Sequence, residues 1–263
     1  MIDLHCHILS GIDDGPEGLG GSLELARRAV NEGIAVTAAT PHVNSRFQLL
    51  AAELETLPER VADLNRELES NGVPLKVVKG AEVSLPRLDS LDRLQLDWLC
   101  LGEGHCLLVE SPYTSPVPFI DEQLFRLQAQ GIQPLLAHPE RSPAFQRAPE
   151  RVERLVRAGA LCSVNAGSLH GAFGRTVRRF AFDLLRDGLV HVVASDAHDH
   201  EQRPPSLLPA LEEAGSELPG ISTEIERLTR VAPAAILSGD PVPQAPKLEG
   251  RPAGRLRGLV RRY

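Results

Sequence analysis

The chain begins with Met1-Ile2-Asp3-Leu4-His5-Cys6-His7, a short apolar run that ends in two histidines. Side chains alternate between the two faces of a β-strand, so this spacing predicts that His5 and His7 face one way and Cys6 the other. Two imidazoles on one face, with Asp13 and Asp14 close behind, indicate one edge of a metal site, because imidazole is the commonest metal ligand and carboxylates add charge; the alternative is a pair of surface histidines. An isolated pair is weak evidence, so the case depends on the rest of the chain.

Six more short apolar runs also finish on polar residues, and helical patterns separate them. Alternating strands and helices are typical of βα units around a parallel sheet. Right-handed crossovers bring the carboxyl ends of such strands to one side, where their polar residues meet in one cavity. A closed barrel is therefore favoured over an open doubly wound sheet, which would scatter them. The six runs end at Thr40-Pro41-His42, Gly80-Ala81-Glu82, Val109-Glu110-Ser111, Ala137-His138-Pro139-Glu140-Arg141, Val164-Asn165-Ala166-Gly167 and Ala194-Ser195-Asp196-Ala197-His198.

Several helices are predicted between these runs. Ser22 is placed to cap a helix that continues to about Asn31. Pro58 is expected to interrupt or kink a second helix. The apolar residues of that helix recur at spacings of three and four: Leu50, Leu54, Leu57, Val61, Leu64 and Leu68. Further helices are predicted near residues 119–130, 149–158, 176–187, 206–214 and 220–230.

The composition indicates the number of domains, the compartment and the state of the cysteines. A chain of 263 residues with 42% hydrophobic content is long enough for one sizeable core, so we expect a single domain. It shows neither a signal peptide nor a run of about 20 apolar residues, which predicts a cytoplasmic protein. The cysteines lack C-x-x-C spacing and are expected to be buried reduced thiols: Cys6, Cys100, Cys106 and Cys162.

Charge is unevenly distributed. The formal net charge of −7 argues against general nucleic-acid binding. Residues 240–263 hold six basic and two acidic residues, a net of +4, which leaves −11 for the rest. We therefore divide the chain into a barrel domain, residues 1–239, and a basic Pro/Gly-rich tail, residues 240–263. A flexible solubilising tail is favoured over one that contacts an anionic membrane or an acidic partner.

The strand ends supply nitrogen and oxygen ligands without a thiolate, which suits manganese, iron or zinc better than magnesium. Four clustered carboxylates carry −4 and would be costly without cations, whereas three divalent ions would turn the site to +2. Such a site attracts a phosphate dianion and supplies hydroxide near neutral pH. The residues fall into three sets: His5, His7, Glu82 and Asp196; Glu110 and His138; and Asp14, His42 and His198.

Two arginines follow the predicted ligands. Arg141 comes three residues after His138, and Arg203 comes five residues after His198. A guanidinium forks onto phosphate oxygens, so both are candidates to bind phosphate. A solvated loop charge is the alternative for each arginine.

Together these motifs resemble the polymerase-and-histidinol-phosphatase (PHP) superfamily. The resemblance rests on His5 through Gly15, Thr40-Pro41-His42, Gly80-Ala81-Glu82-Val83, Ala137 through Arg141, Asn165 through Leu169 and Ser195 through His198, and it spans about residues 1–240. Within that superfamily, the chain is similar to the bacterial manganese-dependent protein-tyrosine phosphatases of the CpsB/YwqE type, which are linked to capsule and exopolysaccharide synthesis. Ser10 departs from the pattern, which usually has proline there, and the basic tail is not part of it.

The resemblance implies a distorted (β/α)7 barrel, a trinuclear metal centre built from the three ligand sets, and phosphate contacts from Arg141 and Arg203. It also favours Asp14 over the adjacent Asp13 as a ligand. Manganese is the first candidate for the metal, with iron, zinc, cobalt and magnesium as alternatives. His42 and a metal-bound water are the candidates for the general acid.

The resulting hypothesis is a phosphomonoesterase that hydrolyses protein phosphotyrosine by attack of metal-bound hydroxide, with a bacterial tyrosine kinase as the expected protein substrate. No cysteine is followed six positions later by arginine, so a phosphocysteine intermediate is disfavoured. Two alternatives are a phosphatase of small molecules such as histidinol phosphate and a non-catalytic phosphopeptide-binding barrel. A nuclease is a weaker third.

Other residues allow two interpretations. Glu140 and Asn165 are candidates to orient the ligands, but they could equally be loop residues without that role. Phe47, Tyr113 and Phe119 could stack on a phosphoaryl ring, although packing is favoured for each. The four remaining histidines are expected to be structural or exposed: His105, His170, His191 and His200.

Overall fold

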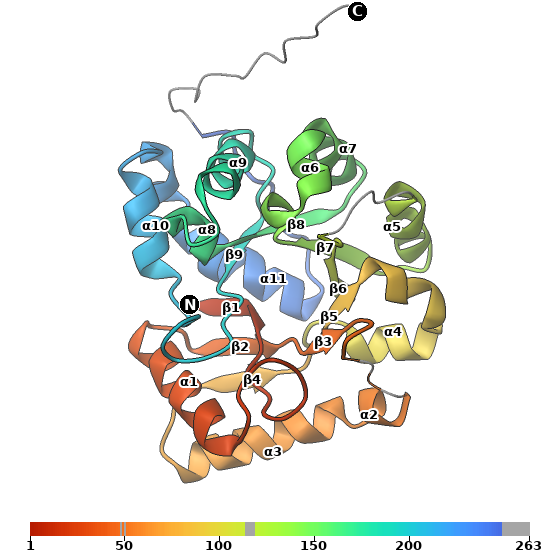
Figure 1. Ribbon diagram of the computed structural model, residues 1–263, viewed down its shortest axis with the longest axis vertical. Coiled ribbons are helices and arrows are strands. Elements are labelled where there is room, and N and C mark those ends of the chain that lie inside the picture. The colour runs from red at the N-terminus through yellow and green to blue at the C-terminus, as the bar shows by residue number, and fades with distance from the viewer. Residues whose placement is uncertain (48, 50, 114–118, 249–263) are drawn as a thin grey trace, which may run out of the picture.

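The computed structural model describes residues 1–47, 49, 51–113 and 119–248. Its strands form two sheets in which all paired neighbours run parallel (Figure 1). The predicted α/β fold with parallel strands is confirmed. The strands in the described part of the chain are β1 (Ile2–Cys6), β2 (Val36–Ala39), β3 (His42–Val43), β4 (Lys76–Val78), β5 (Glu82–Ser84), β6 (Cys106–Glu110), β7 (Gln133–Ala137), β8 (Leu161–Asn165) and β9 (Val192–Ala194).

Two of the seven predicted strands are split. One sheet has the order β1-β2-β4 and the other β3-β5-β6-β7-β8-β9, so the second and third predicted runs each contribute to both sheets. Pro41 lies between β2 and β3 and has no N–H to donate to a ladder. Gly80 lies between β4 and β5, where the backbone passes close to Leu101. A Cβ at this position would be only 2.6 Å from Leu101 Cδ2. All seven predicted runs nevertheless lead to polar residues at strand ends.

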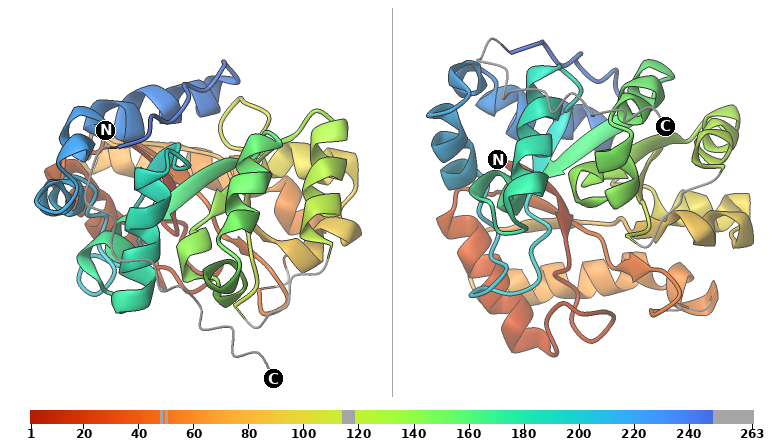
Figure 2. Two further views of the ribbon diagram at one scale, coloured as in Figure 1. Left: turned by 90° about the horizontal axis from the view of Figure 1, so that it is seen from above. Right: turned by 45° about the horizontal axis from the view of Figure 1, so that its top comes forward.

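Most helices cover the outside of the sheets, whereas α11 (Ala232–Ser238) crosses the middle of the molecule and packs against β1 (Figures 1 and 2). The second helical pattern is interrupted next to Pro58, as expected: α2 (Ala51–Glu55) ends before Thr56, and α3 (Leu57–Ser70) carries Pro58 in its first turn. The α-helices are α1 (Leu19–Asn31), α2 (Ala51–Glu55), α3 (Leu57–Ser70), α4 (Arg93–Leu99), α5 (Ile120–Ala129), α6 (Pro143–Arg147), α7 (Glu150–Arg157), α8 (Ala166–His170), α9 (Arg175–Arg186), α10 (Leu208–Gly215) and α11 (Ala232–Ser238); the shorter turns are η1 (Leu85–Ser90), η2 (Pro139–Arg141), η3 (Pro219–Thr223) and the π-turn η4 (Arg227–Val231).

Two helix predictions differ from the structure. Ser22 lies inside α1, where its hydroxyl donates to the carbonyl of Ile8 over 2.7 Å. The helix predicted near residues 220–230 is found only in part: the 3-10 turn η3 comes first, and a helical stretch then begins at Ile225, passes through the π-turn η4 and continues into α11. Pro233 has no N–H to donate to the carbonyl four residues earlier, which is consistent with the π-turn that precedes it. Leu50, assigned to the second helical pattern, lies outside the described residues.

Two apolar clusters hold the strands in place. The larger one includes Cys6 and the buried faces of the outer helices. The smaller one joins Leu4 and other strand residues to Ala232 and Ile236 of α11. Leu4 and Cys6 would share a face in a regular strand, but the register between β1 and β2 shifts after Asp3, which separates them. His5 and His7 then lie together, away from Cys6, as predicted.

The start of the basic tail packs against the domain. The backbone N–H of Leu248 donates to the carbonyl of Arg186 over 3.0 Å. Residues 249–263, which carry most of the predicted basic charge, lie outside the described part, so the division at residue 240 stays a prediction. No helix among the described residues is long and apolar enough to cross a membrane.

Candidate metal centre

The structure brings all nine predicted metal ligands together at the carboxyl ends of the strands. Their side-chain nitrogen and oxygen atoms form overlapping groups, and within each group the atoms lie within 4.8 Å of one another. Most of these side chains are buried. The groups are His7, Asp14, His42 and His198; His5, His7 and Asp196; His5, Glu82 and His138; and His42, Glu82 and Glu110.

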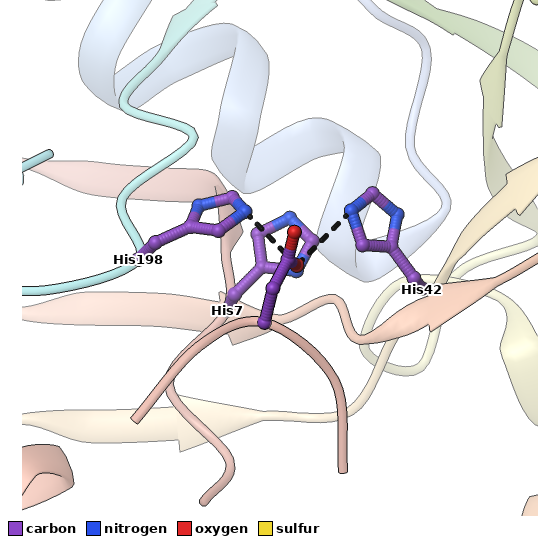
Figure 3. Close-up of side chains that lie close together, drawn as sticks. His7, His42 and His198 are labelled. Atoms are coloured by element: carbon purple, nitrogen blue, oxygen red, sulfur yellow. Dashed lines mark ion pairs between the residues drawn. The ribbon is translucent and has the colours of Figure 1, made fainter. Parts of the chain in front are cut away.

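Three histidines from distant segments face one point. His7 follows β1, His42 begins β3 and His198 follows β9, and Figure 3 shows their rings converging. Asp14 Oδ1 lies 3.4 Å from Nε2 of both His42 and His198. These contacts, led by the one with His198, hold the pKa of Asp14 well below its usual range.

His5 and His7 meet Asp196 in a second group. The two Nε2 atoms are 3.1 Å apart, and Asp196 Oδ1 lies 3.4 Å from each. Two neutral imidazoles at this distance share at most one proton between facing nitrogens. A cation between the two nitrogens and the carboxylate would satisfy all three groups.

Glu82 stands at the centre of the remaining groups. Its Oε1 lies 2.9 Å from His138 Nε2, and its Oε2 lies 2.9 Å from His42 Nδ1 and 3.3 Å from His5 Nε2. Burial alone would raise the pKa of Glu82, but these histidines outweigh it and hold the pKa well below the usual range. An ionised carboxylate whose two oxygens face different histidines is suited to bridge two cations.

Glu110 shows the opposite shift. Burial, and then the charge of Glu82, raise the pKa of Glu110 to about 8. A divalent cation beside both carboxylates would reverse this repulsion. The structure groups Glu110 with His42 and groups His138 with His5, whereas the predicted second set paired Glu110 with His138.

The donor set fits divalent cations. Seven buried polar atoms make no hydrogen bond of good geometry within the described ranges, and three of them belong to predicted ligands at this cluster: His42 Nδ1, Glu82 Oε2 and His198 Nε2. Buried polar groups usually have a hydrogen-bond partner, so three such atoms in one cluster are consistent with bound cations. The nitrogen and oxygen donors, without a thiolate, suit manganese, iron or zinc.

Asp196 connects this centre to both predicted arginines. Its Oδ2 accepts hydrogen bonds from Arg141 Nη1 over 2.6 Å, Arg203 Nη2 over 2.7 Å and Asn165 Nδ2 over 2.8 Å. Its Oδ1 faces His5 and His7. One carboxylate therefore lies between a cluster of predicted metal ligands and two predicted phosphate-binding groups.

Two of the residues at this centre have strained backbones. His138 has φ 31° and Asp196 has φ 53°. Such conformations cost about 1–3 kcal/mol at a residue with a side chain, and they persist where the surroundings fix them, often at functional sites. The turns that follow β7 and β9 thus aim both side chains at the cluster.

Supporting carboxylates hold the ligands in place. Asp13 Oδ2 lies 2.7 Å from His7 Nδ1 and accepts the backbone N–H of His42 over 3.0 Å. Asp13 therefore orients His7, while the adjacent Asp14 faces the cluster. Glu140 accepts hydrogen bonds from the N–H of Asn165 and the hydroxyl of Ser168. Glu140 thus holds Asn165, and Asn165 holds Asp196. These contacts favour a role in orienting the ligands over that of loop residues without such a role.

Asp3 was missed by the sequence reasoning. It is buried in β1 and accepts hydrogen bonds from the N–H and hydroxyl of Ser195, over 3.0 and 2.5 Å. This contact fixes the residue next to Asp196. The one available signal was an acidic residue inside an apolar strand.

The three aromatic candidates differ in their surroundings. Phe47 stacks on His42 with ring centroids 5.7 Å apart. The hydroxyl of Tyr113 lies 3.4 Å from His138 Nδ1. Phe119 is 65% exposed at the start of α5. His105, His170, His191 and His200 belong to none of the candidate ligand groups found within the described residues.

Comparison with known proteins gives concordant matches. Residues 1–232 match the family described as capsular polysaccharide synthesis, CpsB/CapC. The chain is 38% identical over 229 residues to tyrosine-protein phosphatase YwqE of Bacillus subtilis, which covers 85% of this chain and 89% of that protein. It is 31% identical over 208 residues to the putative tyrosine-protein phosphatase CapC of Staphylococcus aureus, covering 78% and 79% of the two chains.

Solved structures agree with these matches. A structure described among those of YwqE from Bacillus subtilis and CpsB from Streptococcus pneumoniae, "unique metal-dependent tyrosine phosphatases", superposes with a TM-score of 0.82 at 30% identity, covering 97% of this chain and 100% of that one. An organophosphorus hydrolase mutant superposes with a TM-score of 0.54 at 14% identity, over 90% of this chain and 92% of that one, which is a likeness of fold alone.

Proposed function

The chain belongs to the CpsB/CapC family of capsular polysaccharide synthesis, and from that premise we propose that it is a metal-dependent phosphatase that hydrolyses phosphotyrosine in proteins. The observation that carries the proposal is the position of Asp196 between the His5–His7 pair and the two arginines. The names of the relatives support it, since they are tyrosine-protein phosphatases.

The nine clustered residues would hold the cations, with manganese as the first candidate. They are His5, His7, Asp14, His42, Glu82, Glu110, His138, Asp196 and His198. Bound divalent cations supply Lewis-acid chemistry, which makes a water molecule nucleophilic near neutral pH and offsets the charge of a phosphoryl group. Asp13 fixes the ring of His7, and Asn165 fixes Asp196, so the protein sets the geometry before substrate arrives.

The two arginines would bind the phosphoryl oxygens. Arg141 and Arg203 both donate to Asp196 Oδ2, so their guanidinium groups lie close together. Each guanidinium has further N–H groups that can donate to a phosphate. A planar guanidinium donates two parallel hydrogen bonds to phosphate. His42 lies at the same cluster with its side chain only partly exposed, and it is our candidate to donate a proton to the leaving group.

The leaving group of phosphotyrosine is a phenol with a pKa of about 10, which needs less help from an acid than an alkyl alcohol does. A cysteine nucleophile is not available. All four cysteines are buried, and burial raises the pKa of every thiol, to about 11 for Cys100. The free thiols also fit the reducing cytoplasm, where we propose that the protein acts.

We propose that the two sheets form a distorted (β/α)7 barrel that closes between β9 and β1. Three contacts support closure. Asp196 N–H donates to the carbonyl of His5 and His7 N–H to that of Ala197, each over 2.8 Å, and Cys6 and Ala197 form a parallel bridge. Amide hydrogen exchange tests this. Protection at His7 and Asp196 equal to that within β6 and β7 supports closure, whereas exchange at the rate of exposed loops contradicts it.

The expected substrate is a phosphotyrosyl protein, and a bacterial tyrosine kinase is the proposed partner. The decisive comparison is kcat/KM on a phosphotyrosyl peptide against kcat/KM on histidinol phosphate, with metal-loaded protein. A large preference for the peptide supports the proposal, and a large preference for histidinol phosphate replaces it with a small-molecule phosphatase. Binding of the peptide without release of phosphate would instead indicate a non-catalytic barrel.

A further inference from the structure

Arg141 rests against two aromatic rings. Its guanidinium carbon lies 4.1 Å from the centroid of the Phe173 ring and 5.2 Å from that of Tyr113. The face of an aromatic ring attracts a cation, most strongly where water is partly excluded, and only 17% of the Arg141 side chain is exposed. Phe173 is the nearer ring, and it comes from a turn that carries none of the clustered ligands.

The backbone holds Phe173 in this place. The ring lies in the turn from Gly171 to Gly174, where Gly174 N–H donates to the carbonyl of Gly171 over 2.9 Å. Both glycines have left-handed conformations, with φ of 84° and 89°, which a residue with a side chain rarely adopts. A Cβ on Gly167 would lie 3.2 Å from Cε2 of Phe173, so the absence of a side chain there leaves room for the ring.

The same segment is tied to Asp196. Asn165 accepts the N–H of Gly167 over 2.7 Å with its Oδ1, and its Nδ2 donates to Asp196 Oδ2. The carbonyl of Gly167 in turn accepts the N–H of Ala172, next to Phe173, over 3.0 Å. A short chain of hydrogen bonds therefore joins the ring to the carboxylate that Arg141 contacts, so ring and carboxylate hold the guanidinium from two directions.

We propose that Phe173 is a positioning residue for Arg141, whose ring keeps the guanidinium aligned to bind the phosphoryl group. The inference rests on the proposed function, because it assigns Arg141 to phosphate. An arginine without the ring would sample more rotamers and would pay more conformational entropy to bind phosphate. Phe173 thus acts on phosphate affinity and not on the chemical step.

The test uses manganese-loaded full-length protein and Phe173→Leu, which keeps an apolar side chain and removes the ring. Inorganic phosphate binding is measured by isothermal titration calorimetry, and KM and kcat on a phosphotyrosyl peptide are measured beside it. We expect the Kd for phosphate and KM each to rise about three- to tenfold, with kcat within about twofold of wild type. Phe173→Tyr, which keeps the ring, should restore both.

A double-mutant cycle separates positioning from general packing. In an Arg141→Ala background, Phe173→Leu should have no further effect on the Kd for phosphate, because the group it positions is gone. Phe182→Leu is the matched control, since that ring lies 4.8 Å from the guanidinium carbon of Arg178 instead of Arg141. It should leave the Kd and KM unchanged. Thermal unfolding of every variant confirms that each is folded at the assay temperature.

Two results would overturn the inference: an unchanged Kd for phosphate in Phe173→Leu, or an equal loss with and without Arg141. A different result would refute the proposed function. If wild-type protein binds phosphate but releases none from any phosphomonoester, the catalytic proposal is wrong, while the binding cycle still decides the role of Phe173.

Discussion

Arg141 and Arg203 converge on a single atom, since both donate to Oδ2 of Asp196, over 2.6 and 2.7 Å. The other oxygen of Asp196 faces His5 and His7. Asp196 thereby couples the position of the arginines to that of the histidine cluster. Phosphate that binds between the two arginines would lie beside the cluster and in reach of its cations.

Replacing either arginine by lysine should weaken the phosphatase without unfolding it. Lysine keeps the charge but loses the planar fork, so we expect kcat/KM on a phosphotyrosyl peptide to fall about 10- to 100-fold. Arg141→Lys should cost more than Arg203→Lys, because Arg141 is less exposed, at 17% against 35%. Steady-state kinetics measure both. Wild-type kinetics in Arg141→Lys would show that this side chain does not contact the phosphoryl group.

Asp13→Asn should weaken metal binding although Asp13 is not a proposed ligand. The hydrogen bond that the Asp13 carboxylate accepts from His7 Nδ1 fixes the ring of His7, and loss of such a contact typically costs 10- to 100-fold in metal affinity. Competition with a chelator measures the change. Asp187→Asn, at an exposed position at the end of α9, is the control and should bind metal as wild type does. Equal affinities in all three proteins would refute the orienting role.

Alkylation should not inactivate the folded enzyme. All four cysteines are buried and burial raises the pKa of each thiol, so reactive thiolate is scarce at neutral pH. Incubation with iodoacetamide should leave at least about 90% of activity, and mass spectrometry should find unmodified cysteines. Stoichiometric loss of activity with labelling of one cysteine would point to a thiol nucleophile instead.

The free energy of unfolding should decrease as the pH is lowered, because His191 titrates at a different pH in the folded and unfolded chains. Burial, and then the nearby charge of Arg227, lower the pKa of His191 to about 4 from its model-compound value of 6.5. Between these values the unfolded chain binds more protons than the folded one, so the free energy of unfolding decreases as pH falls from about 6.5 toward 4. The contribution is up to about 3 kcal/mol.

His191→Asn tests this linkage. The side chain of asparagine can replace Nδ1 of His191, which accepts the backbone N–H of Cys162 over 3.1 Å. Urea unfolding at pH 7 and pH 5, with chelator present, should show a smaller loss of stability in the variant than in wild type. Identical losses would mean that His191 does not titrate in this window.

The outline of the fold could be predicted because strand ends and helix faces follow local periodicity. Each candidate ligand sits where an apolar run ends, and the crossovers then bring these ends together without further information. The partition of the ligands could not be predicted, since whether Glu110 lies nearer His42 or His138 depends on how neighbouring strand ends are offset in space. Asp3 was missed for a similar reason, because its partner Ser195 is 192 positions away in the sequence.

We propose that the strand ends hold a cluster of three divalent cations. Anomalous diffraction at the manganese absorption edge, from crystals of manganese-loaded protein, locates these cations. We expect three peaks among the nine named side chains, with Glu82 and Asp196 each contacting at least one. A single peak at His5 and His7, with Glu82 and Glu110 left without a cation, would refute the three-cation site.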